Sequence, residues 1–193
     1  MAQMRPWNMP GVLKLAVLIL CTALLGLGYL YFYSPITTVI LVRHAEKKIE
    51  PDNSNPALSS AGEERSLELM RILANSGISA IYVTQYQRTQ QTAQPLADRL
   101  RLKTTQVESS NPQEVARQIK ASRAQGSILV VGHNSTVPAI IAALGGGNYP
   151  VIPETEYDNM FVVTLYRVGK AKTLQLKYGS SAPATGNQTM MSQ

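Results

Sequence analysis

Cysteine, histidine and aromatic side chains are scarce in this chain of 193 residues. The one cysteine, Cys21, lies in an apolar segment near the N-terminus. The remainder of the chain can therefore form neither a disulfide nor a cysteine-based zinc site or nucleophile. Only two histidines are present, His44 and His133. Chemistry that needs an imidazole can come from these two positions alone.

Positive charge is in mild excess, with 18 Lys and Arg against 12 Asp and Glu and a formal net charge of +6. The basic residues are scattered and are not interleaved with aromatic ones, whereas nucleic-acid binding usually leaves a dense basic stripe. We therefore expect no nucleic acid as a partner. The excess suits anionic small molecules or an anionic membrane surface.

The longest apolar run spans residues 12–33, with Lys14 as its only charge. The 19 residues from Leu15 to Tyr33 are uncharged, which is enough to cross a bilayer as a helix. We expect this segment to be an uncleaved membrane anchor. With Arg5, Lys14 and the terminal amine on the short side, the positive-inside rule leaves the N-terminus in the cytoplasm and the folded domain in the periplasm or exterior.

Two alternatives compete with the anchor. Basic residues before an apolar run also begin a cleaved signal peptide. Against this, the run is long, and its best small-x-small site, residues 26–28, is followed by more apolar residues. A lipoprotein site at Cys21 is disfavoured because Leu20 precedes it where a small residue is expected.

After the anchor, short apolar runs alternate with helical patterns, and Ser60 to Glu63 resembles a capping box. This order implies an α/β fold: a three-layer αβα sandwich with a mainly parallel mixed sheet and an antiparallel edge. The expected organisation is a cytoplasmic N-terminus and transmembrane anchor at 1–34, one folded domain at 35–178, and a disordered tail at 179–193. The patterns predict strands and helices as follows: strands at 37–42, 78–84, 104–107, 127–131, 160–168 and 173–178, and helices at 60–76, 89–100, 112–124 and 136–144.

Each histidine follows a predicted strand. His44 stands beside Arg43 after the first strand, His133 follows the fourth, and Arg88 follows the second. Because the ligand crevice of an open α/β sheet lies beyond the carboxyl ends of its strands, we expect these side chains to meet in one crevice. Phosphoryl transfer needs a nucleophile and cationic donors around the phosphate oxygens, and imidazoles and guanidinium groups supply both.

Four short segments resemble, in the same order, those of the histidine phosphatase superfamily, the phosphoglycerate-mutase-like group. They are Leu41-Val42-Arg43-His44-Ala45-Glu46, Leu58-Ser59-Ser60-Ala61-Gly62, Arg88-Thr89-Gln90-Gln91-Thr92-Ala93 and Val131-Gly132-His133. The resemblance implies that His44 is the nucleophile and forms a phosphohistidine, and that Arg43, Arg88 and His133 bind the substrate phosphate. It implies no metal and no cofactor. The short connections are similar to those of the small SixA-type phosphohistidine phosphatases, whereas mutases carry longer insertions.

The proton donor for the leaving group is the least defined part of the predicted site. Larger members of the superfamily carry an acid in an insertion after the helix that begins with the Arg88 segment, a region that is short here and offers only Glu108. Glu46, two residues after His44, is the other candidate, and Glu156 and Asp158 are weaker ones. An acid is worth roughly 10²–10⁴-fold in rate for an alkoxide leaving group. Its loss would shift the substrate range toward phosphoramidates or activated esters.

These features predict a histidine-type acid phosphatase that is held in the cell membrane by residues 12–33 and faces away from the cytoplasm. It would act on a phosphorylated small molecule or envelope component through a phosphohistidine on His44. Two alternatives remain: a membrane-tethered, non-catalytic phosphate-binding module, and a phosphohistidine protein phosphatase that faces the cytoplasm. Mutase activity is disfavoured by the short connections.

Overall fold

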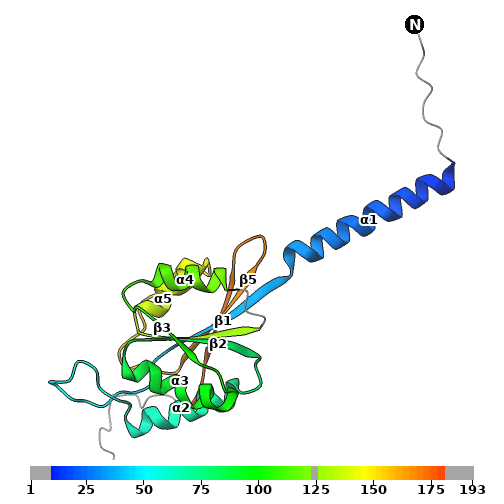
Figure 1. Cartoon of the computed structure of the whole chain (residues 1–193). Helices are drawn as coiled ribbons and strands as arrows, with labels where there is room; N and C mark the ends of the chain where they lie inside the picture. Colours follow the sequence, from blue (N-terminus) through cyan, green and yellow to red (C-terminus); the bar gives the residue numbers. More distant parts are fainter. Residues whose placement is uncertain (1–9, 123–125, 181–193) are drawn as a thin grey trace, which may run out of the picture.

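The computed structural model describes residues 10–122 and 126–180 of the chain. After a long N-terminal helix, strands and helices alternate up to a final hairpin (Figure 1). The elements are α1 (Gly11–Tyr33), β1 (Pro35–Arg43), α2 (Ser60–Leu73), β2 (Ile78–Thr84), α3 (Gln87–Leu100), β3 (Thr104–Val107), α4 (Pro112–Ala121), β4 (Ser127–Gly132), α5 (Thr136–Leu144), β5 (Asn159–Tyr166) and β6 (Lys172–Lys177).

The six strands form one mixed sheet in the order β3-β2-β4-β1-β5-β6. Strands β1 to β4 pair in parallel, whereas β5 runs antiparallel to both β1 and β6. The central strands β1 and β4 are continuous apolar runs buried over most of their length, as strands covered on both faces should be. The carboxyl ends of β1, β2 and β4 therefore lie at one edge of the sheet.

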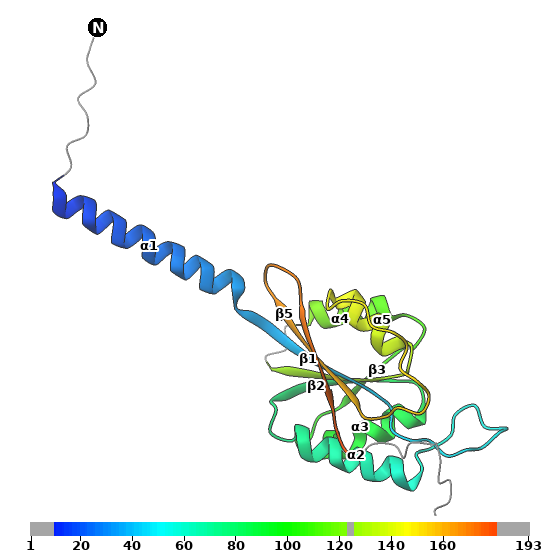
Figure 2. The same cartoon turned by 180° about the vertical axis from the view of Figure 1, so that it is seen from behind.

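Helices cover both faces of the sheet (Figures 1 and 2). On one face α4 and α5 pack on β1, β4 and β5 through residues such as Ile119, Ile141 and Phe161. On the other face α2 and α3 pack on the same sheet through residues such as Leu69, Leu96 and Leu129. This arrangement confirms the predicted αβα sandwich with a mainly parallel mixed sheet.

Helix α1 is long and apolar enough to cross a membrane, with a mean hydropathy of 2.2 over its best window and none of that window buried in the protein. It ends at Tyr33, and β1 begins at Pro35, so Ser34 alone separates the two elements. The β5–β6 turn contacts the end of the helix: the Val168 N–H donates to the Phe32 carbonyl at 3.3 Å. A helix of this kind near the N-terminus is compatible with a membrane anchor and with a signal sequence.

Element boundaries differ from the predicted ones at helix ends. The N-cap of α2 is Ser59, whose hydroxyl accepts from the Gly62 N–H, and the predicted capping box from Ser60 to Glu63 is therefore wrong by one residue. Helix α3 begins two residues earlier than predicted and runs unbroken past Pro95. Most of the predicted tail at 179–193, like the end of the helix predicted at 112–124, lies outside the described residues.

Candidate active site

The four predicted phosphate-site residues come together at the carboxyl edge of the sheet. Arg43 ends β1, and His44 follows it; its backbone N–H donates to the Gly132 carbonyl at 2.9 Å and extends the β1–β4 pairing by one residue. His133 follows β4 directly, and its ring centroid lies 5.4 Å from that of His44. Arg88 is the second residue of α3, just beyond the end of β2.

His44 is held in a defined protonation state and orientation. Its ring is 4 % exposed, and Nδ1 lies 2.8 Å from the Ala45 carbonyl oxygen. A carbonyl can only accept, so Nδ1 carries the proton and Nε2 keeps a free lone pair. The pKa of His44 is lowered to about 3, mainly by burial and also by the charges of Arg43, His133 and Arg88, against the opposing effect of the Ala45 bond. The ring is therefore neutral at pH 7.

His133 is fixed from the other side. Its Nε2 lies 3.0 Å from the Thr84 hydroxyl, and its ring meets that of Tyr86 edge to face at a centroid distance of 5.2 Å. The pKa of His133 is lowered to about 4, mainly by burial and also by the charges of Arg88 and Arg43, against the opposing charge of Glu154. This ring is also neutral at pH 7 in the free protein. Since Thr84 occupies Nε2, Nδ1 is the nitrogen left to meet a ligand.

Arg43 and Arg88 supply permanent positive charge in a buried setting. Arg43 is 2 % exposed, and its guanidinium group stacks on the Tyr157 ring at 4.3 Å. The Arg88 guanidinium group stacks on Tyr86 at the same distance. Burial lowers the pKa of Arg88 from its ordinary value, and the charge of Arg43 contributes. The Nε atoms of both arginines are buried and have no partner among the described residues, as expected of a site built to receive an anion.

A loop before β5 packs against Arg43 on one side of this site. Arg43 Nη1 donates to three of its carbonyl oxygens, those of Pro153, Glu154 and Glu156, at 2.8, 2.9 and 3.1 Å. Arg43 Nη2 donates to the Glu154 carboxylate. Sequence reasoning missed Glu154, because an irregular loop carries no periodicity and only the folded sheet brings it beside β1.

The two acids named as proton donors occupy different places. Both Glu46 carboxylate oxygens accept from Arg65 at 2.7–3.0 Å, which ties the start of the loop after β1 to α2. This geometry indicates a structural ion pair and does not support Glu46 as the acid.

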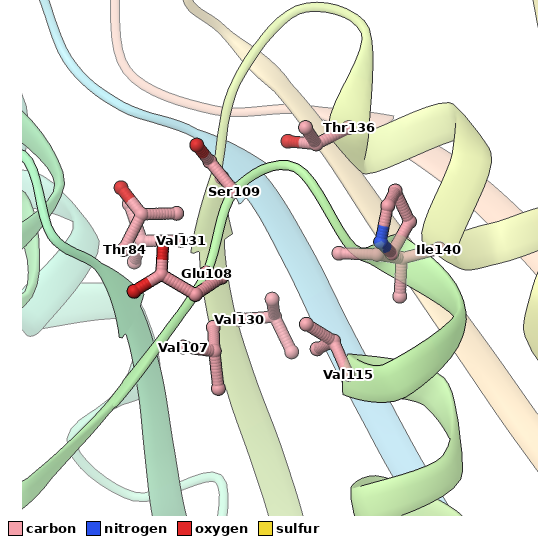
Figure 3. A pocket seen from close by; sticks show the side chains of 11 residues that line it. Thr84, Val107, Glu108, Ser109, Val115, Val130, Val131, Thr136 and Ile140 are labelled. Atoms are coloured by element: carbon pink, nitrogen blue, oxygen red, sulfur yellow. The ribbon is translucent and has the colours of Figure 1, made fainter.

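Glu108 is exposed and, with Thr84, lines a small cavity of about 10 Å³ between β3 and α5 (Figure 3).

Glu156 and Asp158 face the opposite strand. Both carboxylates bind Lys177 of β6, at 2.9 and 2.7 Å. They hold the β5–β6 hairpin to the loop rather than enter the hollow. Among residues 10–122 and 126–180, no group of three or more His, Cys, Asp or Glu side chains lies together in a way that could hold a metal ion.

Comparison with known proteins is consistent with this geometry. The sequence model of the histidine phosphatase superfamily (branch 1) matches residues 39–111, which include Arg43, His44 and Arg88. No curated protein sequence matches the chain. Similar solved structures exist, all of low sequence identity.

Three of these structures illustrate the shared fold. The protein histidine phosphatase SixA complexed with tungstate is 20 % identical, with a TM-score of 0.55 over 72 % of this chain and 96 % of that one. Mycobacterial glucosyl-3-phosphoglycerate phosphatase with inorganic phosphate is 13 % identical, with a TM-score of 0.59 over 75 % and 98 %. Mycobacterial hydrolase 2 is 12 % identical, with a TM-score of 0.56 over 77 % and 92 %. The family model covers only part of the chain, and the three structures share its fold. Residues 39–111 therefore resemble the histidine phosphatase superfamily, and the folded domain has the fold of these proteins.

Proposed function

We propose that this enzyme hydrolyses phosphomonoesters or phosphoramidates through a phosphohistidine formed on His44. The observation that carries the proposal is the hydrogen bond from His44 Nδ1 to the Ala45 carbonyl, in a site whose burial keeps the ring neutral. The bond leaves Nε2 as an unprotonated nucleophile and holds the ring in place while it attacks. Two arginines and a second imidazole around the same hollow suit the oxygens of a phosphoryl group.

The proposed reaction has two displacements at phosphorus. In the first, Nε2 of His44 attacks and the bond to the leaving group breaks, while Arg43 and Arg88 bind the equatorial oxygens on which negative charge is spread. His133 donates from Nδ1 when Thr84 donates its own proton to Nε2, so a neutral ring still serves as a hydrogen-bond donor. In the second displacement, water attacks the phosphohistidine and releases inorganic phosphate.

Trapping of the intermediate tests the proposal. We expect purified protein with excess chelator to hydrolyse an aryl phosphate and, after acid-free quenching, to carry labelled phosphate on His44. The His44→Ala variant should neither turn over nor become labelled. His133→Asn, which leaves the nucleophile in place, should be labelled more slowly. Equal labelling of His44→Ala would refute the mechanism, whereas tight anion binding without turnover on any substrate would favour the non-catalytic phosphate-binding module.

The proposed setting is the outer face of the cell membrane, with α1 as an uncleaved anchor. The basic residues Arg5 and Lys14 on the short N-terminal side support this orientation. The substrate would then be a phosphorylated small molecule or an envelope component outside the cytoplasm. A periplasm-dependent phosphatase reporter fused after Gln193 should be active, and fluorescence of a cytoplasm-only reporter at the same position would contradict the orientation.

A second candidate has support from the fold comparison. The structural likeness to SixA, a protein histidine phosphatase by name, favours a phosphohistidine on a protein as substrate. Such substrates need the site in the compartment where the phosphorylated protein resides. The same pair of reporters therefore separates the candidates, since a cytoplasmic domain favours the protein substrate and an exported one the small molecule.

A further inference from the structure

Among residues 10–122 and 126–180, the Glu154 carboxylate is the one negative group bound directly to a phosphate-site arginine. Its Oε2 accepts from Arg43 Nη2 at 2.5 Å, and its Oε1 accepts from Asn134 Nδ2 at 2.6 Å. Asn134 is the residue after His133, so the two side chains that position Glu154 lie at the carboxyl ends of β1 and β4. Its negative charge also acts on His133 and Arg88, whose imidazolium and guanidinium forms it favours.

Glu154 lies on the solvent-exposed side of the site, whereas His44 is buried. The Glu154 side chain is 72 % exposed, and that of His44 is buried with 4 % exposure. In-line displacement requires the attacking nitrogen and the departing oxygen on opposite sides of phosphorus. With the nucleophile buried, the leaving group is expected on the solvent side, where the exposed Glu154 carboxyl group lies.

Substrate binding changes the surroundings of this carboxyl group. A phosphate oxygen that takes the place of Glu154 on Arg43 removes the ion pair and puts a negative group beside the carboxyl. A carboxyl group released from Arg43 is free to carry the proton that a leaving oxygen needs. Asn134 can keep the displaced side chain close, because its amide still donates to the carbonyl oxygen of a protonated carboxyl.

We propose that Glu154 is the catalytic residue that protonates the leaving oxygen once substrate phosphate has displaced it from Arg43. This inference rests on the proposed phosphohistidine mechanism. In the first step the bond between His44 Nε2 and phosphorus forms, the bond from phosphorus to the leaving oxygen breaks, and the Glu154 proton passes to that oxygen. In the second step water attacks phosphorus, gives its proton to the Glu154 carboxylate, and the electron pair of the phosphorus–nitrogen bond returns to Nε2.

The other candidate acid, Glu108, occupies a less suitable position. It follows β3 and lines a cavity with Thr84, which binds the Nε2 side of the His133 ring. The Thr84 hydroxyl therefore stands on the side of His133 that faces away from the expected phosphate. Glu154 binds the guanidinium group that would hold the phosphate, and no side chain intervenes.

A leaving-group series tests the inference. Hydrolysis by full-length protein is measured for p-nitrophenyl phosphate, phenyl phosphate and an alkyl phosphate, with Glu154→Gln, Glu108→Gln and Glu156→Gln compared with wild type. The amide of Glu154→Gln keeps the size of the side chain but has no acidic proton. We expect its kcat to fall about 10²–10⁴-fold on the alkyl and phenyl esters and less than tenfold on the nitrophenyl ester. Glu156 lies on the same loop, but its carboxylate binds Lys177. The kcat of Glu156→Gln should therefore stay within threefold of wild type on all three esters.

The possible outcomes are distinct. An equal loss on all three esters, or a gain on all of them, would show that Glu154 is only an anion competing for Arg43 and would overturn the inference. Selective loss in Glu108→Gln instead would transfer the role to that residue. Labelling of the His44→Ala variant would refute the underlying phosphohistidine mechanism, whatever the leaving-group series shows.

Discussion

His44 and His133 are kept neutral by burial, and the neighbouring arginines act in the same direction. The pKa of His44 falls to about 3 and that of His133 to about 4, so both rings gain a proton only in acid. Arg43 and Arg88 stay charged, and Glu154 offsets part of their charge in the free protein. The site is thus organised around an anion before any ligand arrives, and protonation of the rings should follow anion binding.

The chain has only two histidines, which makes their titration directly observable by NMR of nitrogen-labelled histidine. We expect neither ring to gain a proton between pH 8 and 5, and the His44→Ala variant assigns the signals. Inorganic phosphate should raise both pKa values, because a bound anion favours imidazolium. A midpoint near 6.5 for either ring without phosphate would contradict the burial that the structure shows.

These depressed pKa values also set a stability trend. The unfolded chain binds protons on its histidines near pH 6.5, whereas the folded chain does so near 4 and 3. The unfolded state therefore holds more protons between these limits, and the free energy of unfolding should fall as the pH is lowered from about 6.5 to 4. The slope should reach up to about 1.4 kcal/mol per pH unit for each histidine. Denaturation at a series of pH values measures it, and a smaller slope in His44→Ala is the control.

Thr84 is a positioning residue for His133. Its hydroxyl lies 3.0 Å from Nε2 and 2.9 Å from the Thr89 hydroxyl. Thr84→Val keeps the shape but leaves a buried ring nitrogen unpartnered, a loss of roughly 1–3 kcal/mol. We expect kcat/KM to fall about tenfold, with rescue by Thr84→Ser and a changed His133 tautomer in the NMR spectrum. An unchanged tautomer would mean that Thr84 acts on packing alone.

Helix α2 packs directly on the segment that follows His44. A Cβ atom on Gly62 would lie 2.1 Å from the Glu46 carbonyl oxygen, so the first turn of the helix touches that backbone. Ser59, the N-cap, also donates its backbone N–H to the same carbonyl at 2.9 Å. Arg65 binds the Glu46 carboxylate and the Tyr178 carbonyl, which joins the active-site loop to the end of β6. The helix therefore fixes the backbone two residues from the proposed nucleophile.

Gly62→Ala tests this contact. Although alanine favours helices over glycine by roughly 1 kcal/mol, overpacking against backbone costs about 1–3 kcal/mol. We expect a net loss of stability in denaturant unfolding together with a lower kcat, because the shift reaches His44. Ser60→Ala, an exposed change in the same turn, should alter neither. A fully active and stable Gly62→Ala would show that α2 and the loop move apart freely.

The sequence allowed the sheet to be predicted more fully than the helix ends and the loops. Continuous buried runs such as β4, and an apolar α5 ended by Gly145 with φ +86°, are local signals. The convergence of His44 and His133 could be expected because parallel strands share a carboxyl edge. Glu154 could not be placed, because its position depends on bonds from Arg43 to an irregular loop more than a hundred residues later. The α2 cap was missed because Ser59 and Ser60 are chemically equivalent candidates.

The orientation of the whole molecule follows from the junction of α1 and β1. With only Ser34 between them, the N-terminal end of β1 lies at the end of the apolar helix. Strand β1 has 9 residues and rises about 3.3 Å per residue, which places Arg43 roughly 30 Å farther on. The β5–β6 turn also contacts the end of α1 and supports this orientation of the domain relative to the helix. The Val168 N–H bonds to the Phe32 carbonyl, and the Arg167 guanidinium group stacks on Tyr31 at 4.3 Å. Figure 1 shows the helix and the carboxyl edge of the sheet at opposite ends of the molecule.

With α1 as the proposed anchor, a site about 30 Å from the bilayer would favour water-soluble substrates over lipid head groups of the same membrane. In proteoliposomes we expect full-length protein to hydrolyse a short-chain, soluble phosphatidic acid but not the long-chain lipid in the same vesicle. Twenty Gly/Ser residues inserted between Ser34 and Pro35 span an r.m.s. distance of about 25 Å. The inserted residues should allow the domain to rotate until its active site faces the membrane surface, so that the variant hydrolyses the long-chain lipid. Activity on the soluble lipid should be unchanged, which is the control. If the wild-type protein hydrolyses the long-chain lipid in its own vesicle as fast as the linker variant does, the active site is not held away from the bilayer, and the proposed orientation is wrong.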